Sequence, residues 1–197
     1  MKRYLFAIVL SMISGCASVG TPITQSNTEV RLPHYSLVVP PDKGWQLSTP
    51  DNNKLEVAVL TKDIGPIRFR IQTMWVAILD EKMRSVPAKT VADDYRNLER
   101  QTMLKEGVER GQYQLNNVVM KDEIIKDKNF FVMTYAKLFP GSQRQLGKLH
   151  LFFPKEERND FFILVLYVEN VLTNTWTDPK PQRNELEEML MSLRVRE

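Results

Sequence analysis

The chain has 197 residues, with 27 Lys and Arg against 24 Asp and Glu, which gives a formal net charge of +3. This near balance excludes the strongly basic face that nucleic-acid binding requires. Cys16 is the single cysteine, so an intramolecular disulfide is also excluded and a hydrophobic core must supply the stability. About 180 residues are enough to build such a core in one domain.

The amino terminus has the composition of an export signal. Lys2 and Arg3 precede an apolar run, residues 4–13, that only Ser11 interrupts. A helix needs roughly 20 residues to cross the hydrocarbon core of a bilayer, so this run is too short for a permanent span. A charged start, a short apolar stretch and small residues after it are typical of a cleaved signal peptide.

The end of this run resembles the lipobox of bacterial lipoproteins, with the residues Ile13, Ser14, Gly15 and Cys16. The resemblance implies that a signal peptidase recognises Ile13, Ser14 and Gly15, that residues 1–15 are removed, and that Cys16 carries a covalent lipid. The alternatives are an ordinary signal peptide with a chance cysteine, or a buried thiol, since cysteine packs as a small hydrophobe. We expect no other cofactor.

Lipidation would anchor the protein to a membrane, because two or more acyl chains on one cysteine hold stably where one binds only marginally. Ala17 stands where the inner-membrane retention signal of enteric-type lipoproteins has aspartate. The resemblance therefore implies the outer membrane, with the domain facing the periplasm or the cell surface. In a source without an outer membrane it implies the plasma membrane. Removal of residues 1–15 takes away Lys2 and Arg3 and lowers the net charge to +1.

The segment after the cysteine has the composition of a linker. Residues 17–31 are polar, rich in Ser, Thr and Asn, and show no hydrophobic period. We interpret residues 16–33 as the lipidated cysteine and a flexible tether, and about 15 flexible residues would reach roughly 20 Å. Residues 34–197 would then form a single domain.

The domain begins with segments that alternate as β-strands do. Residues 35–39 are predicted to form the first strand. Residues 54–61 form another, with Glu56 on one face and three apolar side chains on the opposite face, namely Leu55, Val57 and Val59.

A longer strand follows over residues 67–79. Five of its apolar side chains share one face: Ile67, Phe69, Ile71, Trp75 and Leu79. The opposite face changes from polar to apolar at Met74, Val76 and Ile78, so a helix or another molecule must cover that end.

A helix is predicted to begin at Thr90, with Asp93 three residues later as its capping-box partner. Gly107 or Gly111 would end it. Its inner stripe would consist of Val91, Tyr95, Leu98 and Thr102.

Four strands and a closing helix complete the chain. A hairpin is predicted near Asp127 and Lys128, and residues 147–154 would pair with residues 161–170. Residues 161–168 are apolar at every position, so both faces of that strand must be buried. The closing helix has an apolar stripe, with Glu185, Glu187 and Glu188 outside it or toward its amino end; the stripe comprises Leu186, Met189, Leu190 and Leu193.

This order of elements predicts a single α+β domain, in which helices cover a largely antiparallel sheet. The segments "YSLVVPPDKGWQL", "GKLHLFFPKEERNDFFILVLYVEN" and "ELEEMLMSLRV" resemble the opening, the last hairpin and the terminal helix of the PsbP-type α/β sandwich. The resemblance covers about residues 35–195. It implies binding or assembly roles more than catalysis, and it carries over no site residue.

The sequence contains no recognisable catalytic or metal-binding constellation. A nucleophile elbow and a glycine-rich phosphate loop are both missing from it. His34 is expected at the surface, and His150 in a strand on the face opposite its two leucine neighbours. Acidic residues occur as adjacent pairs, whose side chains point in different directions. We therefore expect no catalytic residues, no metal site and no enzymatic activity.

Two features could form a partner interface. Arg68 and Arg70 project from one face of a strand, and they could meet an acidic partner, a phosphate or a lipid headgroup, or be solvated with a cross-strand pair to Glu56. Trp176 lies in the loop "TNTWTDPKP". It could anchor a partner, because exposed tryptophans often do so, or pack onto the sheet edge.

The sequence is compatible with three functions. The first is a non-catalytic envelope lipoprotein whose domain binds a protein partner as an assembly accessory. The second is a periplasmic module that binds a small molecule or a lipid in an apolar cavity. The third is a hydrolase whose site brings His150 together with a serine and a carboxylate.

Overall fold

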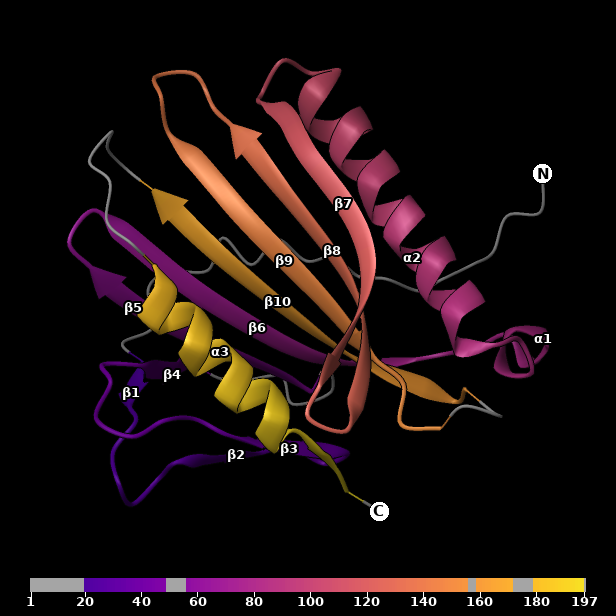
Figure 1. Ribbon diagram of the computed structural model, residues 1–197, viewed down its shortest axis with the longest axis horizontal. Helices are drawn as coiled ribbons and strands as arrows, with labels where there is room; N and C mark the ends of the chain where they lie inside the picture. Colours follow the sequence, from indigo (N-terminus) through magenta and orange to yellow (C-terminus); the bar gives the residue numbers. More distant parts are fainter. Residues whose placement is uncertain (1–19, 49–55, 156–158, 172–178, 197) are drawn as a thin grey trace.

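The computed structural model describes residues 20–48, 56–155, 159–171 and 179–196. Its main feature is an eight-stranded sheet with the strand order β1-β4-β5-β6-β10-β9-β8-β7, in which all neighbours are antiparallel (Figure 1). In that order the strands are β1 (Thr21–Pro22), β4 (Gln46–Ser48), β5 (Val57–Ile64), β6 (Ile67–Ala77), β10 (Phe161–Val171), β9 (Arg144–Phe152), β8 (Lys128–Leu138) and β7 (Gln114–Ile125).

A small second sheet and the helices cover this sheet. The second sheet has the order β11-β3-β2, with β11 (Arg194–Val195), β3 (Tyr35–Val38) and β2 (Glu29–Arg31). The helices are α1 (Glu81–Arg84), α2 (Ala88–Met103), which the π-helical segment η2 (Leu104–Val108) continues, and α3 (Lys180–Ser192). The predicted largely antiparallel sheet with helices against it is confirmed, and the α+β class agrees with this arrangement.

Strand β10 is the central strand, between β6 and β9, and it is buried on both faces as predicted. Ile163 and Val165 on one face belong to the core beneath α3 and the small sheet. Phe162 and Leu164 on the other face belong to a second core beneath α2. An apolar residue at every position is what a strand between two such layers needs.

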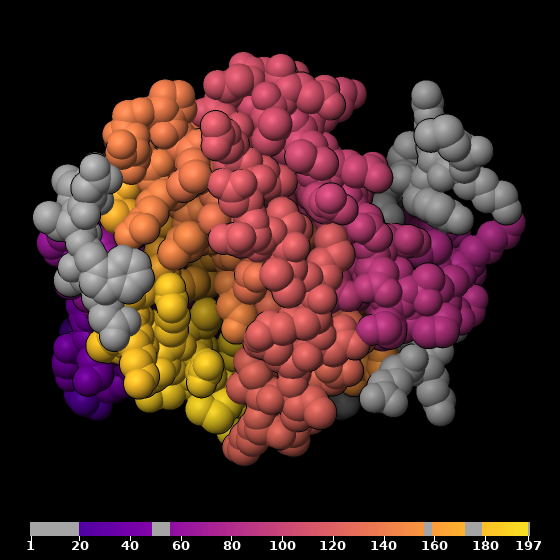
Figure 2. All heavy atoms as spheres, turned by 45° about the horizontal axis from the view of Figure 1, so that its top comes forward, coloured from indigo at the N-terminus to yellow at the C-terminus, as the bar shows by residue number. Residues whose placement is uncertain are grey.

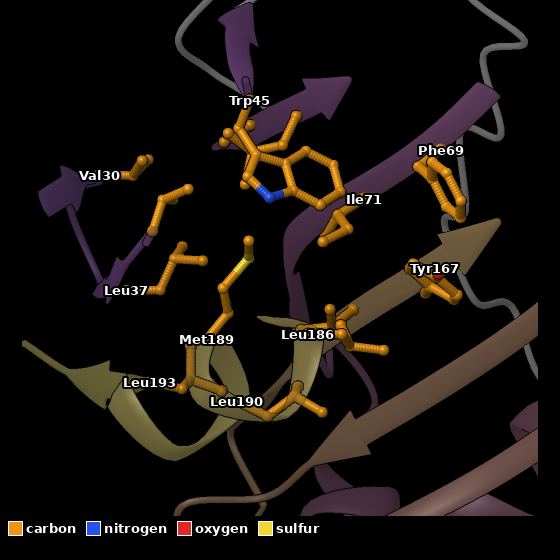
Figure 3. Packing of buried hydrophobic residues seen from close by; sticks show 14 of the residues in the cluster. Val30, Leu37, Trp45, Phe69, Ile71, Tyr167, Leu186, Met189, Leu190 and Leu193 are labelled. Carbon is orange, nitrogen blue, oxygen red and sulfur yellow. The ribbon is translucent and has the colours of Figure 1, made fainter. Parts of the chain in front are cut away.

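The first core joins α3 to both sheets (Figure 3). The predicted stripe of α3 is confirmed, since its four side chains are at most 2% exposed: Leu186, Met189, Leu190 and Leu193. They pack with Val30 and Leu37 of the small sheet, with Ile71 of the large one and with Trp45, which immediately precedes β4. Glu185 was expected outside this stripe but is buried, because its carboxylate accepts a hydrogen bond from Trp45 Nε1 at 2.7 Å.

The second core explains the apolar end of β6. Met74, Val76 and Ile78 pack in the cluster to which α2 contributes Val91 and Tyr95, so a helix covers this face. Leu79, in contrast, is 65% exposed, because β6 ends at residue 77 and the chain turns into α1.

Helix α2 differs from its prediction at its start and on its inner face. It begins at Ala88, after Pro87, and no side chain caps it, so the capping box of Thr90 and Asp93 does not form. Leu98 is 38% exposed. Arg96 is buried beside Tyr95 instead, which turns the inner face of the helix away from Leu98.

The residues of β5 that face the core are shifted by one position from the prediction. Ala58 and Leu60 face the core, whereas Val59 is only partly buried. The strand starts after Glu56, whose left-handed φ of 43° changes the direction of the chain. Leu55 lies outside the described residues.

The predicted tether over residues 16–33 is wrong from residue 20 onward, because the chain is already part of both sheets there. Ile23 and Val30 are each 3% exposed, and the Ile23 amide donates to Trp45 O. The polar residues between them form a turn, in which Asn27 accepts from the Thr24 amide and donates to Pro22 O. Ser, Thr and Asn serve here as turn residues and not as a solvated linker.

Both predicted strand pairs of the second half are confirmed. Ile125 pairs with Lys128 across a two-residue turn in which Lys126 has a φ of 62°. Strand β9 pairs along its whole length with the part of β10 from Ile163 to Val171.

Candidate functional site

A groove of about 360 Å³ lies between α3 and strands β7 to β10. Helix α3 crosses the sheet obliquely, from the side of β5 toward the turn between β7 and β8, so part of β7, β8 and β9 is not covered by it (Figure 1). The opening is the recess between the yellow atoms of α3 and the salmon atoms of β7 and β8 (Figure 2). We call it the α3 groove; it is formed by Asn117, Lys121, Thr134, Tyr135, Ala136, Leu146, Gly147, Lys148, Tyr167, Glu169, Arg183, Leu186 and Glu187.

The sheet wall of the groove carries two lysines that share one carboxylate. Lys121 Nζ lies 2.6 Å from Glu123 Oε1, and Lys148 Nζ lies 2.8 Å from Glu123 Oε2. Burial alone would raise the pKa of Glu123, but the hydrogen bonds from Lys121 and Lys148 outweigh it and lower this pKa. Glu123 is therefore ionised at neutral pH, and the three residues, which we call the Lys-Glu-Lys cluster, carry a net charge of +1.

The opposite wall carries a buried carboxylate that is held by α3. Glu169 of β10 is 2% exposed and accepts two hydrogen bonds from Arg183, at 2.7 and 3.1 Å. Tyr167 lies beside it, and burial together with the charge of Glu169 raises the pKa of the Tyr167 hydroxyl. That hydroxyl makes no hydrogen bond of ordinary geometry with a described residue.

Three apolar side chains lie between these polar walls. Ala136 and Leu146 come from neighbouring strands, where they are register partners, and Leu186 comes from α3. The groove can thus contact an apolar body and a polar head at the same time.

His150 lies below the Lys-Glu-Lys cluster and does not line the groove. It is 0% exposed, and its Nδ1 lies 3.4 Å from Val165 O. Burial, followed by the nearby charge of Lys148, lowers the pKa of His150 to about 3, so the ring is neutral. It faces the side of β9 opposite Leu149 and Leu151 as predicted, but a hydrolytic site built on it has no access for a substrate.

A second polar cluster lies near the small sheet, and no sequence pattern predicted it. His34 Nδ1 lies 2.5 Å from Glu56 Oε1, and the His34 amide donates to Glu56 Oε2 at 3.1 Å. The imidazole stacks on Trp75 with ring centroids 4.6 Å apart. His34 is at the surface as expected, with 47% of its side chain exposed, whereas the Glu56 side chain is 9% exposed. The two residues are 22 positions apart, which explains why spacing did not connect them.

The two predicted interface arginines lie outside the α3 groove. Arg68 pairs with Asp63, its register partner on β5, with Nε 2.9 Å from Oδ1. The expected pair of Arg68 with Glu56 is wrong, because Glu56 is turned toward His34. Arg70 is partly buried and donates to Gln72. Trp176 and the lipobox residues, Ile13, Ser14, Gly15 and Cys16, lie outside the described residues.

No group of three or more His, Cys, Asp or Glu side chains in the described part of the chain is placed to hold a metal ion. Of the helices in the described ranges, none combines the length and the apolar composition that a membrane-spanning helix needs.

Comparison with protein-family profiles gives no match, and comparison with curated proteins gives none. Among solved structures, that of LpqN, a protein involved in cell envelope biogenesis of Mycobacterium tuberculosis, is similar with a TM-score of 0.49 and 10% identity over 90% of both chains. The solution structure of the cyanobacterial PsbP, CyanoP, from Synechocystis sp. PCC 6803 is similar with a TM-score of 0.46 and 14% identity, over 93% of this chain and 95% of that one. Membership of the PsbP-type family stays a prediction.

Proposed function

We propose that this protein is a lipid-anchored, non-catalytic accessory protein of the bacterial cell envelope, and that its domain binds a small amphiphilic ligand in the α3 groove. The anchor rests on the sequence at Cys16, and the binding role rests on the groove. These two parts of the proposal are independent and need separate tests.

The observation that carries the binding role is the combination of size and lining in the α3 groove. A volume of about 360 Å³ lies in the range of small-molecule sites. Leu146 and Leu186 offer apolar contacts, while Lys121 and Lys148 offer charged donors. A ligand with an apolar body and a polar head matches such a lining.

Groove binding can be tested by photolabelling. The full-length lipidated protein in nanodiscs is irradiated with a diazirine derivative of dodecanol, and the labelled peptides are mapped by mass spectrometry. We expect labels in β8, β9 and α3. Ala136→Phe, which fills the groove, should remove them, and Val108→Phe at the exposed surface of η2 should not. Labels spread evenly over the surface, or unchanged by Ala136→Phe, would contradict the proposal.

The anchor can be tested with Cys16→Ser. Without the thiol, no lipid can be attached, so an unprocessed precursor that takes up no labelled palmitate is expected. A Cys16→Ser protein that is still cut and lipid-labelled would show that the anchor is wrong.

A protein partner is the second candidate, and the sheet edge favours it. Strand β7 is an end strand of the large sheet, and among the described strands it pairs with β8 alone. It exposes Val119 by 49% and Ile124 by 79%. Free edges with apolar side chains can accept a strand of another protein. A photoreactive amino acid at Ile124 should then crosslink a defined partner in cells, whereas the same amino acid at Leu98 should not.

A further inference from the structure

We propose that the ligand of the α3 groove is a monoanionic amphiphile, whose carboxylate or phosphate head lies between Lys121 and Lys148. This inference rests on the proposed function, which requires a ligand in the groove but leaves its charge open.

The Lys-Glu-Lys cluster has hydrogen-bonding capacity left for an anion. Each ammonium group has three donors, and each uses one of them on Glu123. One carboxylate balances only one of the two cations, so a positive charge remains at this wall. The Glu123 side chain is 18% exposed and that of Lys148 is 26% exposed, so the field of this charge is only partly screened by water.

The other wall limits the ligand to one negative charge. Arg183 is already bound through two hydrogen bonds to Glu169, which is buried. Glu187 adds a further negative charge on α3. A second anionic group on the ligand would meet these carboxylates, so repulsion disfavours a polyanion.

The apolar lining of the groove favours an amphiphile over a free inorganic anion. The apolar side chains of Leu146, Ala136 and Leu186 can hold an alkyl chain, and each buried methylene strengthens binding by about fourfold.

The experiment compares two photoreactive probes that differ in the head group alone, on the full-length lipidated protein in nanodiscs of phosphatidylcholine. The diazirine derivative of dodecanoate should label the groove peptides about tenfold more than that of dodecanol at equal concentration, because a charge-assisted hydrogen bond contributes that much to binding. A third probe, phosphatidylglycerol with a photoreactive acyl chain, is held in the bilayer. Groove labels from it identify a membrane lipid as the source of the anion, and labels from dodecanoate alone identify a free fatty acid.

Charge variants of the cluster make the test quantitative. Lys121→Gln brings the cluster to neutrality and should reduce dodecanoate labelling to the level of dodecanol. Glu123→Gln brings it to +2 and should increase dodecanoate labelling. Lys105→Gln removes an exposed lysine of η2 and should change nothing. Since the Lys121 side chain is 53% exposed, its replacement is compatible with folding, and circular dichroism checks this.

The outcomes separate the two proposals. If dodecanol and dodecanoate label the groove equally, or if neither charge variant changes the ratio, the anionic head is wrong while groove binding stands. If no probe labels the groove, the proposed function fails together with this inference.

Discussion

Gly147 of β9 lies directly under the aromatic ring of Tyr135, its register partner on β8. A Cβ atom added at Gly147 would lie 2.1 Å from Tyr135 Cζ and 2.4 Å from its hydroxyl oxygen. The absence of a side chain at residue 147 therefore allows the ring to lie flat on the strand, as aromatic residues do over sheet glycines. Both residues belong to the part of the sheet that borders the α3 groove.

We predict that Gly147→Ala lowers the free energy of unfolding by about 3 kcal/mol, the upper range for an overpacked core position. Urea unfolding measures this. Adding Tyr135→Leu should recover much of the loss, whereas adding Tyr135→Phe should not, because Phe keeps Cζ. Gly141→Ala is the matched control. It has open space and a φ of 82°, so only a backbone cost of about 1 kcal/mol is expected. Equal losses in Gly147→Ala and Gly141→Ala would refute the steric explanation.

The ion pair of Lys62 and Glu185 gives a second prediction. Lys62 Nζ lies 2.9 Å from Glu185 Oε2, and the two side chains are 8% and 11% exposed. Lys62→Met leaves a buried carboxylate without its cation, so we expect a loss of about 3 to 5 kcal/mol in the free energy of unfolding. The double variant Lys62→Met with Glu185→Leu should recover most of it.

The exposed pair of Asp63 and Arg68 is the control for this experiment, since both side chains are more than half exposed. Arg68→Gln should change the stability by less than about 1 kcal/mol. A Lys62→Met protein as stable as Arg68→Gln would show that the buried pair does not hold α3 onto the sheet.

Arg96 gives a third prediction. Its side chain is 2% exposed, and Nη1 donates at 3.0 Å to the carbonyl oxygens of both Lys121 and Val132. A lysine ammonium cannot reproduce this planar arrangement of donors. Arg96→Lys should therefore destabilise the protein by about 3 kcal/mol in urea unfolding. Asp93 also pairs with Arg96, but it is 44% exposed, so Asp93→Asn should have a much smaller effect. A larger loss of stability in Asp93→Asn than in Arg96→Lys would contradict this prediction.

His150 gives a prediction about pH. Burial lowers its pKa to about 3 in the folded protein, from 6.5 in the unfolded chain. Between these values the unfolded chain binds a proton that the native state excludes, so the stability falls as the pH falls from 6.5 to about 3. One such group contributes about 1.4 kcal/mol for each pH unit. His150→Leu should remove this contribution, so that its stability declines less than the wild type's between pH 6.5 and 4.5. If the stability of His150→Leu and that of the wild type decline equally over this pH range, other groups cause the acid sensitivity.

Much of the fold could be predicted from the sequence where hydrophobic periodicity is strong. The apolar stripe of α3 has to pack against one layer, and the apolar strand β10 needs a layer on each of its faces. These patterns therefore predict what must lie against each element. The apolar end of β6 likewise required a cover, which α2 provides.

The polar parts of the structure could not be predicted, because their partners lie far apart in the chain. Lys62 and Glu185 are 123 residues apart, and His34 and Glu56 are 22 apart. The α3 groove depends on the oblique course of one helix over the sheet, which no local pattern determines. Composition was misleading at residues 21–31, where residues typical of a linker form strands and a turn.

The early start of the fold has a mechanical consequence for a protein anchored at Cys16. Three residues lie between Cys16 and Gly20, where the described fold begins, and even a fully extended chain covers only about 14 Å over these four steps. A lipidated Cys16 would thus keep the domain close to the surface of the bilayer. Its encounters would be with molecules of the membrane surface, and not with targets across the width of the periplasm.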